Sequence, residues 1–155
     1  MPDRLRVKMT TFEKRIQVNF SQNQMYNLVA DVAAYPEFIP WCRQVAILDN
    51  QPDVKLVRIG LRFKQLPELS LTTRATFHPA ASLHLRLVSG SFLSQFEGDW
   101  HFEASGEETC LVTFVVKYRF ANSLLRLTLA PFFSLMVSML PGIFIQRAKE
   151  IYQHD

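Results

Sequence analysis

The sequence predicts an α+β fold, in which a curved antiparallel sheet of about seven strands wraps around a long C-terminal helix and two short helices follow the first strand. Three observations predict it. Apolar and polar residues alternate in successive stretches between residues 43 and 120, with short turns between them, which is typical of an antiparallel meander. A short helical pattern follows the first strand, and a long apolar helix ends the chain. The 155 residues suit one domain, 1–155, with 1–10 as a flexible N-terminus.

The first strand and the first helix are predicted from the segment 12–32. Alternation over 12–19 indicates a strand, although Lys14 lies in the apolar register. Ser21 and Gln24 have the spacing of a capping box, in which each side chain accepts a hydrogen bond from the backbone of the other residue. An apolar stripe that includes Met25 and reaches Val32 then predicts an amphipathic helix.

The segment 35–42, YPEFIPWC, contains three aromatic residues, two prolines and a cysteine. The residue before a proline avoids helical backbone angles, so the first helix should end near Tyr35. Pro36 suits the first turn of a new helix, and Pro40 limits that helix to about one or two turns. We therefore expect a second short helix here that turns the chain into the sheet.

Six further strands follow from alternation and turn residues. One of them, 54–63, shows a slip in apolar parity that predicts a β-bulge near Val57 or at Gly60. The expected strands are 43–49, 54–63, 69–77, 83–87, 96–103 and 110–120.

The last helix should be capped by Asn122 or Ser123 and run towards Gln153, with a kink at Pro131 and a break or bend at Pro141-Gly142. Its segment 124–145 is long and apolar enough to cross a bilayer. The interrupting polar and proline residues, and the need of the strands for a cover, favour a helix that packs on the sheet.

This helix is apolar on more than one face, which one sheet cannot bury. Two readings stay open. Either the core is thick and the remaining face forms a contact with a second copy of the chain, or some residues line a cavity for an apolar ligand or touch a membrane surface.

Composition excludes several other classes of protein. The hydrophobic content of 48% argues against disorder. Cys42 and Cys110 have no metal-ligand or disulfide spacing, and the histidines are scattered, so we expect no metal site. Asp99 and His101 share one strand face, but an exposed pair of this kind is typical of a solvated surface, and no catalytic residue is predicted. The net charge of +3 and dispersed basic residues give only a weak signal for RNA binding.

Four segments carry a resemblance to a known family. FSQNQMYNLVADVAAYPEFIPWC at 20–42, GSFLSQFEGDWHF at 90–102, the strand 110–120 with its following Asn122, and 146–152 resemble, in order, the coenzyme Q-binding protein family, which also contains the bacterial ribosome-association toxin. Both belong to the START-like, polyketide cyclase superfamily. Ser91 and Pro141-Gly142 depart from the family pattern.

The resemblance implies a helix-grip fold with a hydrophobic tunnel. It implies a non-enzymatic protein that binds a polyprenyl quinone such as ubiquinone, as a lipid chaperone for respiratory electron transfer and quinone biosynthesis. No cofactor is required; the quinone is the ligand. The alternative is a toxin that binds the large ribosomal subunit and blocks subunit joining. An aromatase or cyclase would need polar groups inside the tunnel, where the inward positions are almost all apolar.

Twelve residues are candidates for ligand contact under this reading. Three of them, in the segment 35–42, are expected at the mouth, where amphipathic aromatics suit an apolar-to-wet boundary. The set is Tyr35, Phe38, Trp41, Phe63, Leu71, Leu85, Phe96, Trp100, Phe114, Tyr118, Met136 and Leu140. Candidate partners are a lipophilic quinone, a membrane touched from its surface, and a second copy of the chain; the ribosome is a partner only under the alternative. We expect a cytoplasmic protein or one peripheral to the inner membrane, on the matrix side in a mitochondrion.

Overall fold

The computed structural model describes residues 9–63 and 66–153. Its centre is a seven-stranded sheet in the order β1-β7-β6-β5-β4-β3-β2, and every pair of neighbours is antiparallel. The predicted α+β fold and meander are confirmed. The strands are β1 (Thr10–Val18), β2 (Cys42–Asn50), β3 (Val54–Leu61), β4 (Leu69–His78), β5 (Ser82–Gly90), β6 (Leu93–Ala104) and β7 (Cys110–Phe120).

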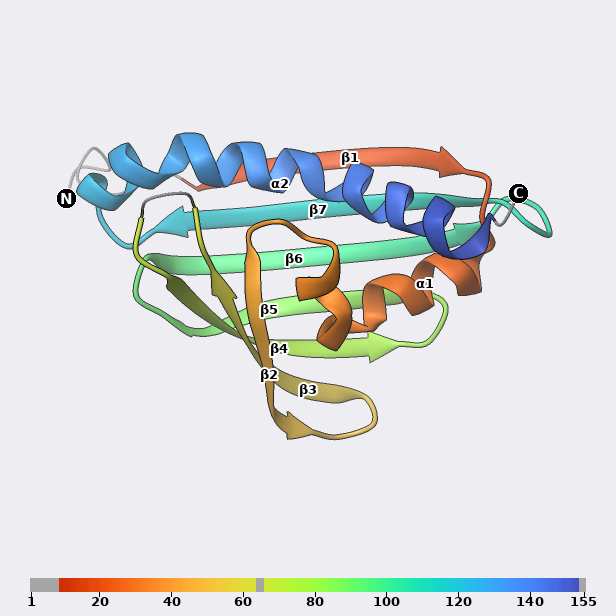
Figure 1. The fold of residues 1–155 in the computed structure, drawn as a ribbon, viewed down its shortest axis with the longest axis horizontal. Coiled ribbons are helices and arrows are strands. Elements are labelled where there is room, and N and C mark those ends of the chain that lie inside the picture. The colour runs from red at the N-terminus through yellow and green to blue at the C-terminus, as the bar shows by residue number, and fades with distance from the viewer. Residues whose placement is uncertain (1–8, 64–65, 154–155) are drawn as a thin grey trace.

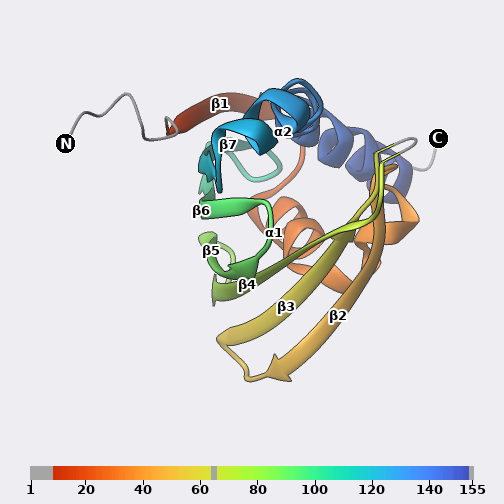
Figure 2. The same ribbon diagram turned by 90° about the vertical axis from the view of Figure 1, so that its left-hand side faces the viewer.

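The sheet curves strongly from β1 round to β2, and both α-helices lie on its inner side (Figure 2). Helix α1 (Gln22–Ala30) follows β1, and helix α2 (Ser123–Tyr152) runs along β7 and β1 (Figure 1). A 3₁₀-helix, η2 (Val32–Glu37), joins α1 to the connection that enters β2. A flexible N-terminus was predicted for residues 1–10. Residues 1–8 lie outside the described part, and Thr10 belongs to β1.

The capping box predicted for α1 is present. The Ser21 side chain accepts a hydrogen bond from the Gln24 backbone, and the Gln24 side chain accepts one from the Ser21 backbone. The predicted end of α1 and start of the second helix were wrong. Val32 begins η2 rather than continuing α1, and η2 ends at Glu37, so Pro36 lies near its end.

We expect Ser21→Ala to lower the free energy of unfolding by about 1 kcal/mol, because one helix-terminal N–H loses its acceptor. Urea unfolding would measure the change. Ser123→Ala is a matched control, since Ser123 is an exposed first-turn residue of α2, whose cap is Asn122; it should change stability by less than about 0.5 kcal/mol. Equal effects of the two substitutions would refute the role of the capping box.

The β-bulge predicted within 54–63 lies on the partner strand instead. Register shifts occur at two places between β2 and β3, and each leaves one extra residue on β2, Arg43 or Leu48. These shifts lie opposite Gly60 and Val57, respectively. The parity slip therefore pointed to the correct positions along the ladder but to the wrong strand, because a single strand cannot reveal which partner carries the extra residue.

A break or a bend was predicted at Pro141-Gly142, and a break does not occur there, because helix α2 is continuous through Pro131 and Pro141. A proline inside a helix removes one backbone hydrogen bond and favours a bend. Here the segments on both sides of Pro141 are held against the sheet by buried side chains, Val137 before it and Phe144 after it. Tertiary packing therefore outweighs the local cost.

Two aromatic clusters fix α2 on the sheet. Phe133 packs edge-on against three rings of the β6–β7 region, with centroids 4.8 to 5.8 Å away: Phe92, Tyr118 and Phe120. Phe144 packs edge-on against Tyr35, Phe38 and Trp100 at 5.1 to 5.4 Å. The space between these two anchors, under the middle of α2, contains the candidate site.

Candidate ligand-binding cavity

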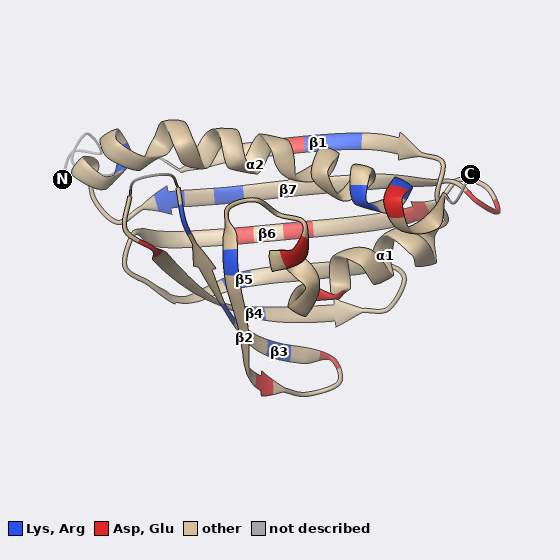
Figure 3. Cartoon of the chain, in the orientation of Figure 1, with Lys and Arg blue, Asp and Glu red and all other residues tan. Residues whose placement is uncertain are grey.

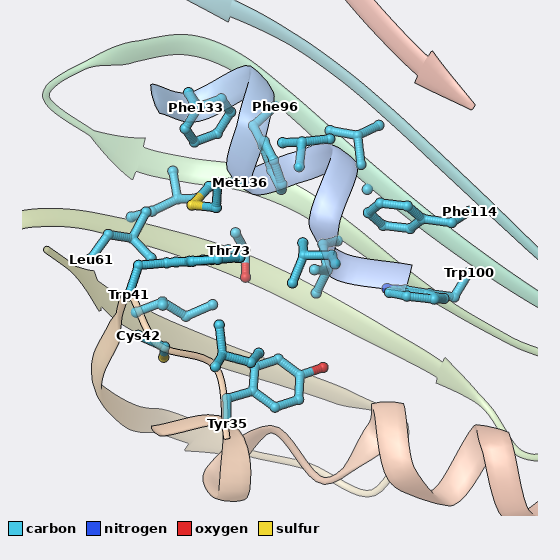
Figure 4. Close-up of a pocket in the computed structure, with 18 of the residues that line it drawn as sticks. Tyr35, Trp41, Cys42, Leu61, Thr73, Phe96, Trp100, Phe114, Phe133 and Met136 are labelled. Atoms are coloured by element: carbon cyan, nitrogen blue, oxygen red, sulfur yellow. The ribbon is translucent and has the colours of Figure 1, made fainter. Parts of the chain in front are cut away.

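An apolar cavity lies between α2 and the inner face of the sheet (Figure 4). The space in which the centre of a water molecule fits is about 90 Å³, and all empty space, including solvent at the opening, is about 740 Å³. The lining comes from η2 and its connection to β2, from β2 to β7 and from α2: Tyr35, Ile39, Trp41, Cys42, Ile59, Leu61, Leu71, Thr73, Leu85, Phe96, Gly98, Trp100, Phe114, Val116, Phe133, Met136, Val137, Leu140 and Phe144.

The cavity forms because the inward-facing positions of a curved sheet converge on a helix that is too narrow to fill the curve. Gly98, in the middle of β6, enlarges this space, because it has no side chain where its neighbours Phe96 and Trp100 project inwards. Trp41 and Leu140 are half-buried, so this part of the lining is reached from solvent.

Among the residues that the structure describes, none that lines the cavity is charged. Burial raises the pKa of the Cys42 thiol to about 11, so it stays protonated at neutral pH and is a poor nucleophile. Burial, together with the neighbouring Cys42 and Asp31, raises the pKa of Tyr35. The Tyr35 hydroxyl donates a hydrogen bond to the backbone carbonyl of Val29, which ties η2 to α1. Both side chains are therefore neutral.

Thr73 differs from the rest of the lining. It is 0% exposed, and its hydroxyl has no hydrogen-bond partner within the described part of the chain. A buried hydroxyl without a partner costs about 1–3 kcal/mol. Thr73 lies on the inward register of β4, between Leu71 and Ala75. An apolar residue at this position would avoid the cost of burying an unpartnered hydroxyl.

Nine of the twelve residues predicted from the sequence line this cavity: Tyr35, Trp41, Leu71, Leu85, Phe96, Trp100, Phe114, Met136 and Leu140. Their contact with a ligand stays a prediction. Tyr35 does not lie at the mouth, however. It is 7% exposed and packs against Phe144, because η2 turns its ring under the end of α2.

Three predicted residues lie outside the lining. Phe38 packs edge-on against Tyr35 and Phe144, with ring centroids 6.1 and 5.3 Å apart. Phe63 comes after β3 and stacks on Phe132 of α2, with ring centroids 6.3 Å apart. Tyr118 packs behind α2, where its hydroxyl forms a hydrogen bond of 3.0 Å with Ser134. Strand parity places Tyr118 on the inner face correctly, but α2 covers that position.

Sequence reasoning missed several lining residues. Thr73 and Gly98 lie on the inward registers of β4 and β6, so strand parity could have found them. They were overlooked because neither is a large apolar residue. The prediction of Phe133, Val137 and Phe144 would have required knowledge of how α2 is rotated about its axis. A helix that is apolar on all sides does not reveal this rotation.

The outer face of the sheet carries a polar cluster centred on Asp99. Its Oδ1 lies 2.6 Å from His84 Nδ1 and 2.9 Å from Arg86 Nη1. His84 Nε2 lies 3.1 Å from Ser82 Oγ. The sequence suggested that Asp99 and His101 share a strand face. In the structure the histidine that contacts Asp99 is His84, because β5 places it directly opposite Asp99. Ser82 is 7% exposed and lies with His84 on β5, opposite β6, so these contacts link β5 to β6.

We expect Asp99→Asn to lower the free energy of unfolding by about 1 kcal/mol at pH 7. Burial opposes ionisation of Asp99, but hydrogen bonds from Arg86 and His84 outweigh it, and the pKa lies below its ordinary value of 3.8. A group with a lowered folded-state pKa stabilises the protein above its unfolded-state pKa, and this contribution is lost as pH falls through the folded-state pKa.

Urea unfolding of wild type and Asp99→Asn at several pH values would test this. The difference between them should be full at pH 7 and should shrink below about pH 4. Glu103→Gln is a control, since Glu103 is an exposed β6 carboxylate. A difference that is independent of pH would contradict the assigned role of the Asp99 charge.

The outer face of α2 is exposed and apolar. Leu124, Leu127 and Leu135 are 73%, 67% and 61% exposed, and Phe132 and Met139 are also exposed. Helix α2 is long and apolar enough to cross a membrane by length and composition, and 33% of its most apolar window is buried. It lies along the sheet as the cover that the sequence predicted, and one side remains uncovered (Figure 1).

Within residues 9–63 and 66–153, no group of three or more histidine, cysteine or acidic side chains could hold a metal ion. The cavity under α2, with its mostly apolar lining, suits an apolar ligand.

The chain is similar in sequence to two kinds of known protein. The chain is 30% identical over 143 residues to the ribosome association toxin RatA of Pseudomonas aeruginosa, which covers 92% of this chain and 98% of that protein. It is 28% identical to the mitochondrial coenzyme Q-binding protein COQ10 homolog B of Xenopus laevis over 87% of this chain and 56% of that protein.

A solved structure shares the fold. The Zhui aromatase/cyclase of Streptomyces sp. R1128 superposes with a TM-score of 0.81 at 15% identity, covering 92% of this chain and 94% of that one. The family described as polyketide cyclase / dehydrase and lipid transport matches residues 18–144. The chain therefore belongs to this START-like family.

Proposed function

We propose that the protein binds a polyprenyl quinone, or a closely similar apolar molecule with a ring-shaped head group, and carries it as a lipid chaperone. The observation that supports this most is the cavity under α2, with its uncharged and almost wholly apolar lining. Burial of each CH₂-sized unit of such a ligand contributes about 0.8 kcal/mol. The similarity to a coenzyme Q-binding protein agrees with a quinone as the ligand.

The cavity volume bears on how such a ligand would lie. A space of about 90 Å³ for water centres holds several water molecules and suits a ring, but it does not suit a long polyprenyl tail. In this proposal the head group lies inside, and the tail leaves past Trp41 and Leu140. In this proposal the protein binds its ligand without an enzymatic step, because general acid–base catalysis needs titratable groups and those of the described lining are the neutral Tyr35 and Cys42.

Organic extraction of the purified protein, followed by mass spectrometry, tests the proposal. We expect a prenylated quinone in molar proportion to the protein when it is isolated from cells with their membranes. Repeated absence of any prenyl lipid, together with no binding on titration, would refute it.

The proposal includes peripheral contact with a membrane through the exposed face of α2, as expected for a cytoplasmic or matrix-side carrier. The 22 residues of the apolar segment 124–145 contain Arg126 as their only charge, and Figure 3 shows the other charges of α2 near its C-terminal end. Apolar side chains that enter the acyl region, with a flanking cation, are typical of interfacial helices.

We expect the double substitution Leu127→Glu and Leu135→Glu to reduce co-flotation with vesicles of anionic phospholipid by at least about tenfold. Both side chains are more than 60% exposed, so folding should be preserved, which circular dichroism would check. Gln146→Glu, an exposed position on the same helix, serves as control. Unchanged flotation of the double variant would contradict membrane contact through this face.

A second candidate function is association with the large ribosomal subunit. It is favoured by the 30% identity to the toxin RatA over 98% of that protein's length. Sucrose-gradient co-sedimentation with separated ribosomal subunits distinguishes the two functions. Association with the large subunit that weakens as salt rises would support this second function, and no association at low salt would exclude it.

A further inference from the structure

We infer that Thr73 is the hydrogen-bond anchor for the polar end of the ligand, and that its hydroxyl selects apolar molecules with a carbonyl-type acceptor over plain hydrocarbons. This inference rests on the proposed function and adds the residue that orients the ligand. It follows from a feature of Thr73 that the other described lining residues do not share, a fully buried side-chain oxygen or nitrogen atom without a hydrogen-bond partner.

The position of Thr73 leaves its hydroxyl no protein partner. In the ladders of the sheet it lies between Val57 of β3 and Leu87 of β5, and neither side chain can accept a hydrogen bond. The other hydroxyl in the lining, that of Tyr35, donates to the Val29 carbonyl. Figure 4 shows Thr73 Oγ1 in the middle of the lining side chains, between Met136 and Tyr35.

The chemistry of the surroundings defines what Thr73 would bind. A threonine hydroxyl donates one hydrogen bond. Because the described residues of the lining carry no charge, a neutral acceptor such as a quinone or ketone oxygen is the suitable partner. An anionic head group would lie in this lining without a counter-charge, which is costly. The ligand class is therefore a neutral carbonyl compound with an apolar body, with its carbonyl in the interior rather than at the opening.

The test compares two ligands and three proteins by calorimetric titration. The ligands are a benzoquinone with a ten-carbon tail and decylbenzene, which has the same tail but no acceptor oxygen. The proteins are wild type, Thr73→Val and Thr73→Ser. Valine keeps the shape and removes the hydroxyl, and serine keeps the hydroxyl.

We expect Thr73→Val to bind the quinone about 3- to 10-fold more weakly than wild type and to bind decylbenzene within about twofold of wild type. Thr73→Ser should keep most of the quinone affinity. Without ligand, Thr73→Val should melt at the same temperature as wild type or about 2–4 °C higher, because an unpartnered hydroxyl has been replaced by a methyl group.

The outcomes separate the two claims. If wild type binds the quinone and Thr73→Val binds it equally well, Thr73 is not the anchor, although the proposed function stands. The same conclusion follows if both ligands weaken equally, since the loss is then one of shape. If wild type binds neither ligand, the proposed function is refuted, and the inference is refuted with it.

Discussion

Replacement of Phe144 by alanine is expected to lower the free energy of unfolding by about 3–5 kcal/mol. Phe144 is 1% exposed and makes edge-on contacts with Tyr35, Phe38 and Trp100. Its removal leaves a hole where η2, β6 and the C-terminal half of α2 meet. Edge-on aromatic pairs add about 0.5–1.5 kcal/mol each beyond the area that they bury, so the loss should lie in the upper part of this range.

Guanidinium unfolding followed by circular dichroism would measure this change. Phe132→Ala is a matched control on the same helix, because Phe132 is 42% exposed and, among the described residues, its ring contacts only the ring of Phe63. We expect it to cost about 1 kcal/mol. Similar costs for the two substitutions would mean that α2 is not anchored on the sheet through Phe144.

Replacement of Gly98 by leucine is expected to weaken binding of a ten-carbon-tailed benzoquinone by more than about 100-fold, which corresponds to about 2.7 kcal/mol. Gly98 lines the cavity, and its backbone conformation is one that other residues adopt, since no glycine of the described chain has a positive φ. A leucine side chain places three carbon atoms beyond Cβ in the space that the proposed head group occupies.

Gly98→Ala distinguishes occlusion from general damage to the sheet. An added Cβ would meet Phe96 at 3.5 Å and Leu85 at 3.7 Å, which is ordinary van der Waals contact. Alanine should therefore leave the affinity within about threefold and the fold intact. If Gly98→Leu folds and still binds the quinone as wild type does, the ligand lies elsewhere.

The fold was predictable because its signals are local and agree with one another. Alternation predicted the strands, Ser21 and Gln24 predicted the start of α1, and Asn122 was named as a cap of α2. The details that failed depend on partners distant in the sequence. The bulges opposite Val57 and Gly60 belong to β2, and the continuity of α2 at Pro141 depends on packing against the sheet.

The candidate site was predictable only where the alternation of a strand decides to which face of the sheet a side chain points. Leu71, Leu85, Phe96, Trp100 and Phe114 face the cavity because they occupy inward positions of their strands. The rotation of α2 and the fold of η2 are set by tertiary contacts. Because of these contacts, α2 covers Tyr118 so that it does not line the cavity, and Tyr35 is buried rather than at the opening.

Thr73 shows a different limit of sequence reasoning. A threonine in a strand has good local propensity and attracts no notice. Only the absence of a partner for its buried hydroxyl, which the described structure reveals, distinguishes it from an ordinary core residue.

The central claim, that the cavity binds a quinone, is tested most directly by tryptophan fluorescence. The chain has two tryptophans, Trp41 and Trp100, and both line the cavity. A quinone accepts energy or an electron from an excited indole at contact. The account predicts that titration with the ten-carbon-tailed benzoquinone quenches the emission along a saturable, one-site curve, and that decylbenzene in excess reverses the quenching. Quenching that rises linearly without saturation, at the rate found for free tryptophan, would contradict the account.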